Sequence, residues 1–191
     1  MKCVELVISN SVISWQHELK YLGVVFNSAC YLKLNVHKNK VKFFQSFNSI
    51  YSKLGSSNCK DTIVHLMRTN CLSVLMYGLE SVELTKSNVN SLEYPLTRSF
   101  IKMFHVNEKN TISWCQYYMN QLPVKFLIDI RKRRYFEKLS KTDCMLLQYL
   151  YINSAFRSLD DINAKYNIDK KDSDNVFLYN VWNVFKSEII V

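Results

Sequence analysis

The chain has 191 residues, of which 48% are hydrophobic and 14% aromatic, so it can bury a core and is too apolar to be intrinsically disordered. It carries 25 Lys and Arg against 16 Asp and Glu, a net charge of +9, which favours nucleic acid as a partner first and an acidic membrane surface second. With only 3 Gly and 2 Pro, it has few helix breakers, which favours long helices with few tight turns.

Strand-forming residues dominate the first 30 positions. Residues 3–8 are largely β-branched and apolar, and residues 10–11 form a plausible turn. Residues 12–15 and 21–26 follow as further strand candidates. We therefore expect a small antiparallel hairpin or sheet over residues 3–26.

From Asn35 the hydrophobic period becomes helical. One face recurs at intervals of four, three, four, three and four residues up to Gly55, which is placed to end the helix. This face comprises Val36, Lys40, Phe43, Phe47, Ile50 and Leu54. Lys40 is its polar member, and we expect the long stem of Lys40 to reach out to water.

Two more helices are predicted before residue 106. One runs from about residue 61 to 77 and stops at Gly78, and the next runs from about 86 to 104 with Thr85 as its N-cap. Pro95 lies inside the latter, where a missing N–H removes a helical hydrogen bond. We therefore expect a kink or a break near Tyr94.

Helices are also predicted for the rest of the chain. The helical pattern resumes at 114–119 after a polar stretch, and Pro123 suits the first position of a helix that runs to Leu139. Asp143 is a candidate cap for a helix ending at about Ala155. Shorter helices at about 158–167 and 174–189 complete a mostly α fold that follows a small N-terminal β-hairpin or sheet.

The most basic segment holds no acidic residue between Glu18 and Asp61. It contains seven lysines: Lys20, Lys33, Lys38, Lys40, Lys42, Lys53 and Lys60. Lys38 and Lys42 are four residues apart and share one side of the predicted helix, where ammonium groups could neutralise successive phosphates. The alternative is a basic face that contacts only water.

A second basic cluster is Arg131-Lys132-Arg133-Arg134. Four consecutive charges point around a helix, so they cannot all contact one ligand. We take Arg131 and Arg134 as candidate phosphate contacts. A localisation signal, or internal pairing with Asp129 and Glu137, remains open.

We find no complete catalytic or metal centre in the sequence. The closest two of the six cysteines are 12 residues apart, whereas zinc sites use close pairs, and scattered cysteines are typical of reduced thiols in an intracellular protein, nuclear or cytoplasmic. The one adjacent acidic pair, Asp160-Asp161, lies in a predicted helix and reads as a first-turn acidic pair. No apolar run reaches the roughly 18 residues of a membrane span, and no signal peptide follows Met1.

The segment ELKYLGVVFN, residues 18–27, resembles the block that follows the palm in reverse transcriptases of non-LTR (LINE-type) retrotransposons. There, a Tyr-Leu-Gly strand belongs to the primer-grip hairpin that leads into the thumb. KVKFFQSFNSIYSKLG is similar to the first thumb helix of that family, and CLSVLMYGLESVELTKSNVNSLEYPLTRSFIKMF is similar to the next two. CQYYMNQLPVKFLIDIRKRRYFEKL resembles the tail found in such elements, so the likeness covers roughly residues 1–140.

The resemblance implies three segments: the end of the palm with the primer grip (1–30), a thumb-like helical bundle (31–106) and a C-terminal helical tail (107–191). It assigns Tyr21, Leu22 and Gly23 to the primer grip and the first thumb helix to the template–primer duplex. The fingers, the palm and the palm's metal-binding aspartates are missing from this sequence, and Pro95 lies where the family has an uninterrupted helix.

We therefore expect a reverse-transcriptase fragment that binds an RNA–DNA or DNA duplex and is not an enzyme on its own. It would use no cofactor, since Mg²⁺ would belong to the absent palm, and no small-molecule substrate or membrane. Its other partner would be a palm and fingers region supplied separately. A non-enzymatic helical protein-interaction module, and a non-functional relic of a decayed element, are the alternatives.

Overall fold

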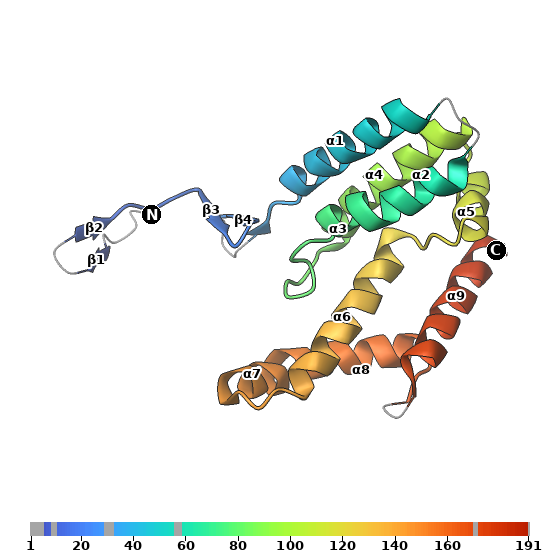
Figure 1. Ribbon diagram of the computed structural model, residues 1–191. Helices are drawn as coiled ribbons and strands as arrows, with labels where there is room; N and C mark the ends of the chain where they lie inside the picture. The colour runs from blue at the N-terminus through green and yellow to red at the C-terminus, as the bar shows by residue number, and fades with distance from the viewer. Residues whose placement is uncertain (1–5, 9–10, 29–32, 56–58, 170–171, 191) are drawn as a thin grey trace.

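The computed structural model describes residues 6–8, 11–28, 33–55, 59–169 and 172–190. A two-stranded antiparallel sheet pairs β1 (Leu6–Ile8) with β2 (Ser11–Ile13), and a three-stranded one has the order β3 (Glu18–Tyr21), β4 (Val24–Asn27), β5 (Lys33–Leu34). The α-helices are α1 (His37–Leu54), α2 (Lys60–Leu66), α3 (Leu72–Leu75), α4 (Lys86–Phe104), α5 (Lys109–Tyr118), α6 (Val124–Ser140), α7 (Met145–Leu150), α8 (Phe156–Lys165) and α9 (Asp174–Ile190). The expected mostly α fold with a small N-terminal β region is confirmed (Figure 1).

The predicted strand over residues 21–26 is interrupted by a hairpin turn: Tyr21 ends β3, and residues 24–26 belong to β4. Tyr21 pairs with Val24, which leaves Leu22 and Gly23 as a two-residue loop. Both loop residues have positive φ, 46° and 85°, as a type I′ turn requires. The prediction was wrong because it treated the aromatic and β-branched residues as one uninterrupted strand. The turn forms with Leu22 at a positive φ, which is unfavourable for a residue other than glycine and so was not expected.

The predicted second helix contains a π-helical turn, η1 (Met67–Cys71), between α2 and α3. Its fully buried side chains recur every four residues: Ile63, Met67, Cys71 and Leu75. An interval of four drifts by about 40° per step around an α-helix of 3.6 residues per turn. The wider π turn compensates for this drift and keeps these four side chains in the core that α1 also lines.

The same spacing explains a second π-helical turn, η2 (Tyr151–Ala155), between α7 and α8. Leu147, Tyr151, Ala155 and Leu159 again follow one another at intervals of four and face the C-terminal core. Residues 145–165 therefore form one continuous helical stretch, not the two helices predicted. Asp160-Asp161 lies in the C-terminal third of this stretch and not in a first turn. Cys144, not Asp143, is the N-cap residue.

Helix α4 was predicted correctly at both ends, but the break that Pro95 could have caused near Tyr94 is absent. Thr85 caps it, because its side chain accepts a hydrogen bond from the Asn88 N–H at 3.2 Å. The helix continues without a break through Pro95, which is buried in the core. The Ser99 hydroxyl donates to the Pro95 carbonyl at 2.9 Å. Packing of both helix halves against the core outweighs the single hydrogen bond that the proline removes.

Two apolar cores share helix α6. The first core extends from Val36 to Ile128 and the second from Leu122 to Ile189. Val124 and Ile128 face the first, whereas Phe126 and Ile130 face the second. The predicted segment boundaries after residues 30 and 106 stay predictions. Pro123 is the N-cap residue of α6, one position before the predicted one.

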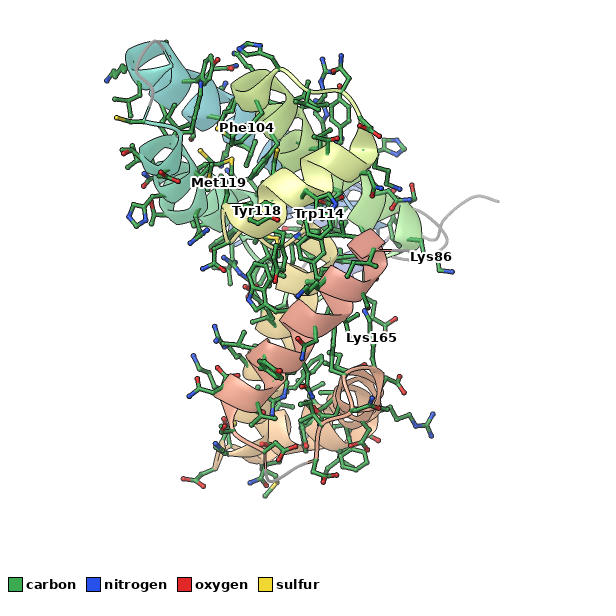
Figure 2. All side chains as sticks on the ribbon, turned by 90° about the vertical axis from the view of Figure 1, so that its right-hand side faces the viewer. Lys86, Phe104, Trp114, Tyr118, Met119 and Lys165 are labelled. Carbon is green, nitrogen blue, oxygen red and sulfur yellow. The ribbon has the colours of Figure 1, made fainter. Side chains whose placement is uncertain are left out.

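Aromatic side chains join α5 to α9 and so hold the two cores together. The Tyr117 ring lies 5.9 Å from that of Trp182 and 6.2 Å from that of Phe185, measured between ring centroids. Trp114 and Tyr118 lie along the same helix, α5, where it crosses toward α9 (Figure 2). In the described part of the chain, no helix is both long and apolar enough to span a membrane.

Candidate nucleic-acid interface

The outer side of α1 presents Lys38, Lys42 and Lys53. Lys42 and Lys53 are eleven residues apart, about three helical turns, so they lie on the same side and about 16 Å apart along the axis. Lys38 lies one turn before Lys42. All three side chains are exposed, and α1 contains no acidic residue.

One of these three lysines is already paired. The Lys38 ammonium forms an exposed salt bridge with Glu18 on β3. Surface ion pairs of this kind contribute little to stability and exchange readily with other charges. Among the described residues, Lys42 and Lys53 have no ion-pair partner, so they are the cations of this side that remain available to a ligand.

Lys40 points in a different direction. It is half-buried, and its ammonium donates to the Ser91 hydroxyl of α4 at 2.7 Å. The expectation that it reaches water was wrong, because α4 lies beside this face of α1 and offers an acceptor. Lys40 therefore joins the two helices and does not share a side with Lys42. The side chain of Lys33 lies outside the described residues.

Structure reveals a groove between α1 and α4 that the sequence reading missed. The two helices run parallel, since Lys40 meets Ser91 near their starts and Asn48 meets Lys102 near their ends. A cavity of about 480 Å³ lies between them. Its lining holds no carboxylate: Phe44, Phe47, Asn48, Arg98, Ser99, Ile101, Lys102, His105 and Asn107.

Cations and aromatic rings alternate along this groove. The Arg98 guanidinium carbon lies 6.0 Å from the ring centroid of Tyr94, which is largely exposed. The Lys102 ammonium lies 4.8 Å from the Tyr51 ring centroid and donates to Asn48 Oδ1 at 3.0 Å. Residues 98, 102 and 105 follow at intervals of four and three, a spacing visible in the sequence. Such a surface can neutralise phosphates and stack bases.

Glu93, the single carboxyl on α4, faces away from the groove. It accepts a hydrogen bond from the Val124 N–H at 2.7 Å and so occupies the N-terminus of α6. Burial raises its pKa to about 7, although the N–H groups of Val124 and Lys125 and the Lys125 ammonium oppose the rise. The exposed faces of α1 and α4 beside the groove are therefore free of carboxylates.

Tyr21, Leu22 and Gly23 form the tip of the β3–β4 hairpin, which docks on Tyr77. The Tyr77 hydroxyl donates to the Leu22 carbonyl at 3.1 Å. A Cβ added to Gly23 would lie 3.3 Å from the Tyr77 ring, so glycine serves both the positive φ and the close approach. The Tyr21 and Leu22 side chains are 64% and 74% exposed, and therefore available for contacts.

Arg131 lies beside this tip, although it is more than 100 residues away in sequence. It lines the same cavity of about 420 Å³ as Tyr21, Leu22 and Tyr77. Its guanidinium donates to Glu80 Oε1 at 3.2 Å and to the Met76 carbonyl at 3.3 Å. The fold thus brings two predicted site segments together, but Glu80 already neutralises the arginine.

Arg133 and Arg134 of the second basic cluster are held internally. Arg134 Nε and Nη2 donate to Asp174 Oδ2 of α9, at 3.0 and 2.7 Å. Arg133 is buried, pairs with Glu137 at 2.8 Å and Asp174 at 3.2 Å, and lies 4.5 Å from the Phe177 ring centroid. Internal pairing, left open by the sequence, is confirmed for Glu137. Asp129 instead contacts Lys165 and Tyr166.

The described residues offer neither a metal-binding cluster nor, at Cys71, a reactive thiol. No cluster of three or more His, Cys, Asp or Glu there could hold a metal ion. Burial raises the pKa of the Cys71 thiol to about 11, which keeps it protonated and unreactive. No protein-family model, curated protein or solved structure matches the chain.

Proposed function

We propose that this chain binds a nucleic-acid duplex, RNA–DNA or DNA, across the outer side of α1 and the α1–α4 groove. The observation that carries the proposal is that Lys42 and Lys53 of α1 and Arg98 and Lys102 of α4 have no acidic partner among the described residues, and that neither α1 nor the groove lining holds a carboxylate. By contrast, Arg131, Arg133 and Arg134 each pair with a carboxylate.

The arrangement favours a phosphate backbone over a compact anion. Lys42 and Lys53 are about 16 Å apart along α1, a span that fits several successive phosphates better than one small ligand. Exposed Tyr94, beside Arg98, adds a stacking surface. The groove cations and the α1 lysines lie on different sides of α1, so a ligand that contacts both sets must extend across the helix.

The likeness to the thumb of a retrotransposon reverse transcriptase supports the same role. In that family the segment matched by α1 follows the template–primer duplex, and the segment matched by the β3–β4 tip belongs to the primer grip. We propose that this chain is such a thumb and tail, with the exposed Tyr21 and Leu22 near the duplex end. Polymerisation would then require a palm and its Mg²⁺ supplied by another polypeptide, and the location would be intracellular.

The test compares two charge-matched double variants. Lys42→Ala with Lys53→Ala should weaken binding of a labelled RNA–DNA hybrid by about tenfold or more, and equally for all sequences, because phosphate contacts carry no sequence information. Lys141→Ala with Lys186→Ala removes the same charge from exposed positions beyond α6 and on α9. Equal weakening by both pairs would mean that net charge, not this surface, drives binding.

A further inference from the structure

The α7–η2 stretch and the first residue of α8 present an apolar surface that stays largely exposed in the described part of the chain. Residues 144–156 contain no charged residue. One side of this helical stretch packs on the second core through Leu147, Tyr151 and Ala155. The remaining large apolar side chains are exposed by 40 to 84%: Met145, Leu146, Tyr149, Leu150, Ile152 and Phe156.

This surface is large enough for a protein interface. With large side chains offering on the order of 100 Å² each, six exposed ones present roughly 600 Å² of apolar surface per chain. Two copies would bury roughly 1,200 Å², which is the lower end of specific interfaces. Monomeric proteins rarely expose an apolar patch of this size without using it.

The charge distribution of the chain favours a second copy of the same chain as the binding partner of this surface. Two chains of net charge +9 repel each other over most of their surfaces, so they can associate only where the charge is absent. The uncharged stretch meets that requirement, and it offers no cation to a nucleic-acid phosphate. It also lies at the opposite end of the molecule from α1 (Figures 1 and 2), so association would leave the basic surface free.

The two charged residues that flank residues 144–156 indicate how two copies would be oriented relative to each other. Exposed Asp143 lies at the start of this stretch and exposed Arg157 at its end, and neither has an ion-pair partner among the described residues. Antiparallel packing places Asp143 of one copy beside Arg157 of the other, twice, around a two-fold axis. Parallel packing would place like charges together.

We propose that the chain forms an antiparallel, two-fold symmetric dimer through the exposed apolar face of α7 and η2. Because both copies contribute the same patch, the patch is fully used in the dimer and no further copies can add to it. Each dimer carries two copies of the α1–α4 surface. The dimer does not depend on whether that surface binds nucleic acid.

The experiment is sedimentation equilibrium of the nuclease-treated full chain over a range of micromolar concentrations. The wild-type mass should rise from 22.6 kDa to twice that value. Tyr149→Asp with Ile152→Asp should weaken dimerisation by about 100-fold or more, because carboxylates would be desolvated in the interface. Tyr179→Asp is the matched control, since Tyr179 is similarly exposed but lies on α9, and it should remain dimeric.

A charge swap tests the orientation. Asp143→Arg and Arg157→Asp should each weaken the dimer, and the double variant should restore it toward the wild-type dissociation constant. Circular dichroism verifies that each variant keeps its helix content. A wild-type chain that stays monomeric at all concentrations, a Tyr149→Asp/Ile152→Asp variant that still dimerises, or monomers that instead bind phosphatidylcholine vesicles through this face would overturn the proposal.

Discussion

Ionisation of Glu93 on α4 should make the free energy of unfolding depend on pH, and the substitution Glu93→Gln should remove that dependence. The pKa of Glu93 rises from 4.5 to about 7, because the cost of burying the carboxylate exceeds the stabilisation by the Val124 and Lys125 N–H groups and the Lys125 ammonium. In the unfolded chain the pKa returns to its ordinary value. At a pH between the unfolded and the folded pKa of Glu93, the folded state holds a proton that the unfolded state has released. The free energy of unfolding therefore falls as the pH rises through this range.

The size of the effect follows from the pKa. At about 1.4 kcal/mol per pKa unit, a rise from 4.5 to about 7 corresponds to about 3 kcal/mol. Glu93→Gln keeps an oxygen for the Val124 N–H and has no proton to lose. The stability of the variant relative to wild type should therefore grow by about 3 kcal/mol from about pH 4.5 to about pH 8. Urea unfolding at a series of pH values, followed by circular dichroism, measures this difference.

The opposite slope would refute the reasoning. If the wild type gained stability over the variant with rising pH, the ionised carboxylate at the α6 N-terminus would be stabilising, and the helix dipole would outweigh the cost of burial. Carbon-13 NMR of the Glu93 carboxyl provides an independent check. Its resonance should titrate near neutral pH in the folded chain, and a transition near the ordinary glutamate value would contradict the account of burial.

Three further substitutions test local features of the fold. Thr85→Ala should cost about 1 kcal/mol in urea unfolding, because it removes the N-cap of α4. Gly78→Ala should cost about 1–3 kcal/mol, since the residue has a φ of 72° and an added Cβ would lie 2.5 Å from Val24 Cγ2; an unchanged melting temperature would contradict this geometry. Tyr77→Phe should speed hydrogen exchange at the β3–β4 tip by removing its bond to Leu22, and unchanged rates would mean that the tip is held otherwise.

Long helices with strong end signals were predictable from the sequence. Thr85 at the start of α4 and the apolar stripe of α1 up to Leu54 agree with the structure, because a cap and a helical period are local properties. Gly55 follows α1 as predicted, although its φ of −66° is right-handed. There, a Cβ would lie 2.5 Å from the Tyr51 carbonyl oxygen. Glycine at this position permits the close approach of the Tyr51 carbonyl, and it does not end α1 by the left-handed conformation that was expected.

The π-helical turns could not be predicted from the apolar spacing alone. Ile63, Met67, Cys71 and Leu75 follow one another at intervals of four. Leu92, Leu96, Phe100 and Phe104 of α4 have the same spacing, yet α4 is an α-helix throughout. Packing against the neighbouring helices therefore decides whether such a segment widens into a π turn.

The partners of the basic residues could not be read from the sequence. Arg131 meets Glu80 and Arg134 meets Asp174, which are 51 and 40 residues away. No local pattern distinguishes these arginines from Lys42, whose charge remains unpaired among the described residues. The groove cations Arg98 and Lys102 had a helical spacing, but their relation to Asn48 and Tyr51 depends on α1 and α4 packing in parallel.

The salt dependence of duplex binding tests the central claim most directly. If Lys42, Lys53, Arg98 and Lys102 each neutralise one phosphate, the affinity for an RNA–DNA hybrid should fall about 150-fold between roughly 50 and 200 mM salt. Replacing all four by alanine should remove most of that dependence. An affinity that is insensitive to salt, or a slope that the four replacements leave unchanged, would contradict nucleic-acid binding by this surface.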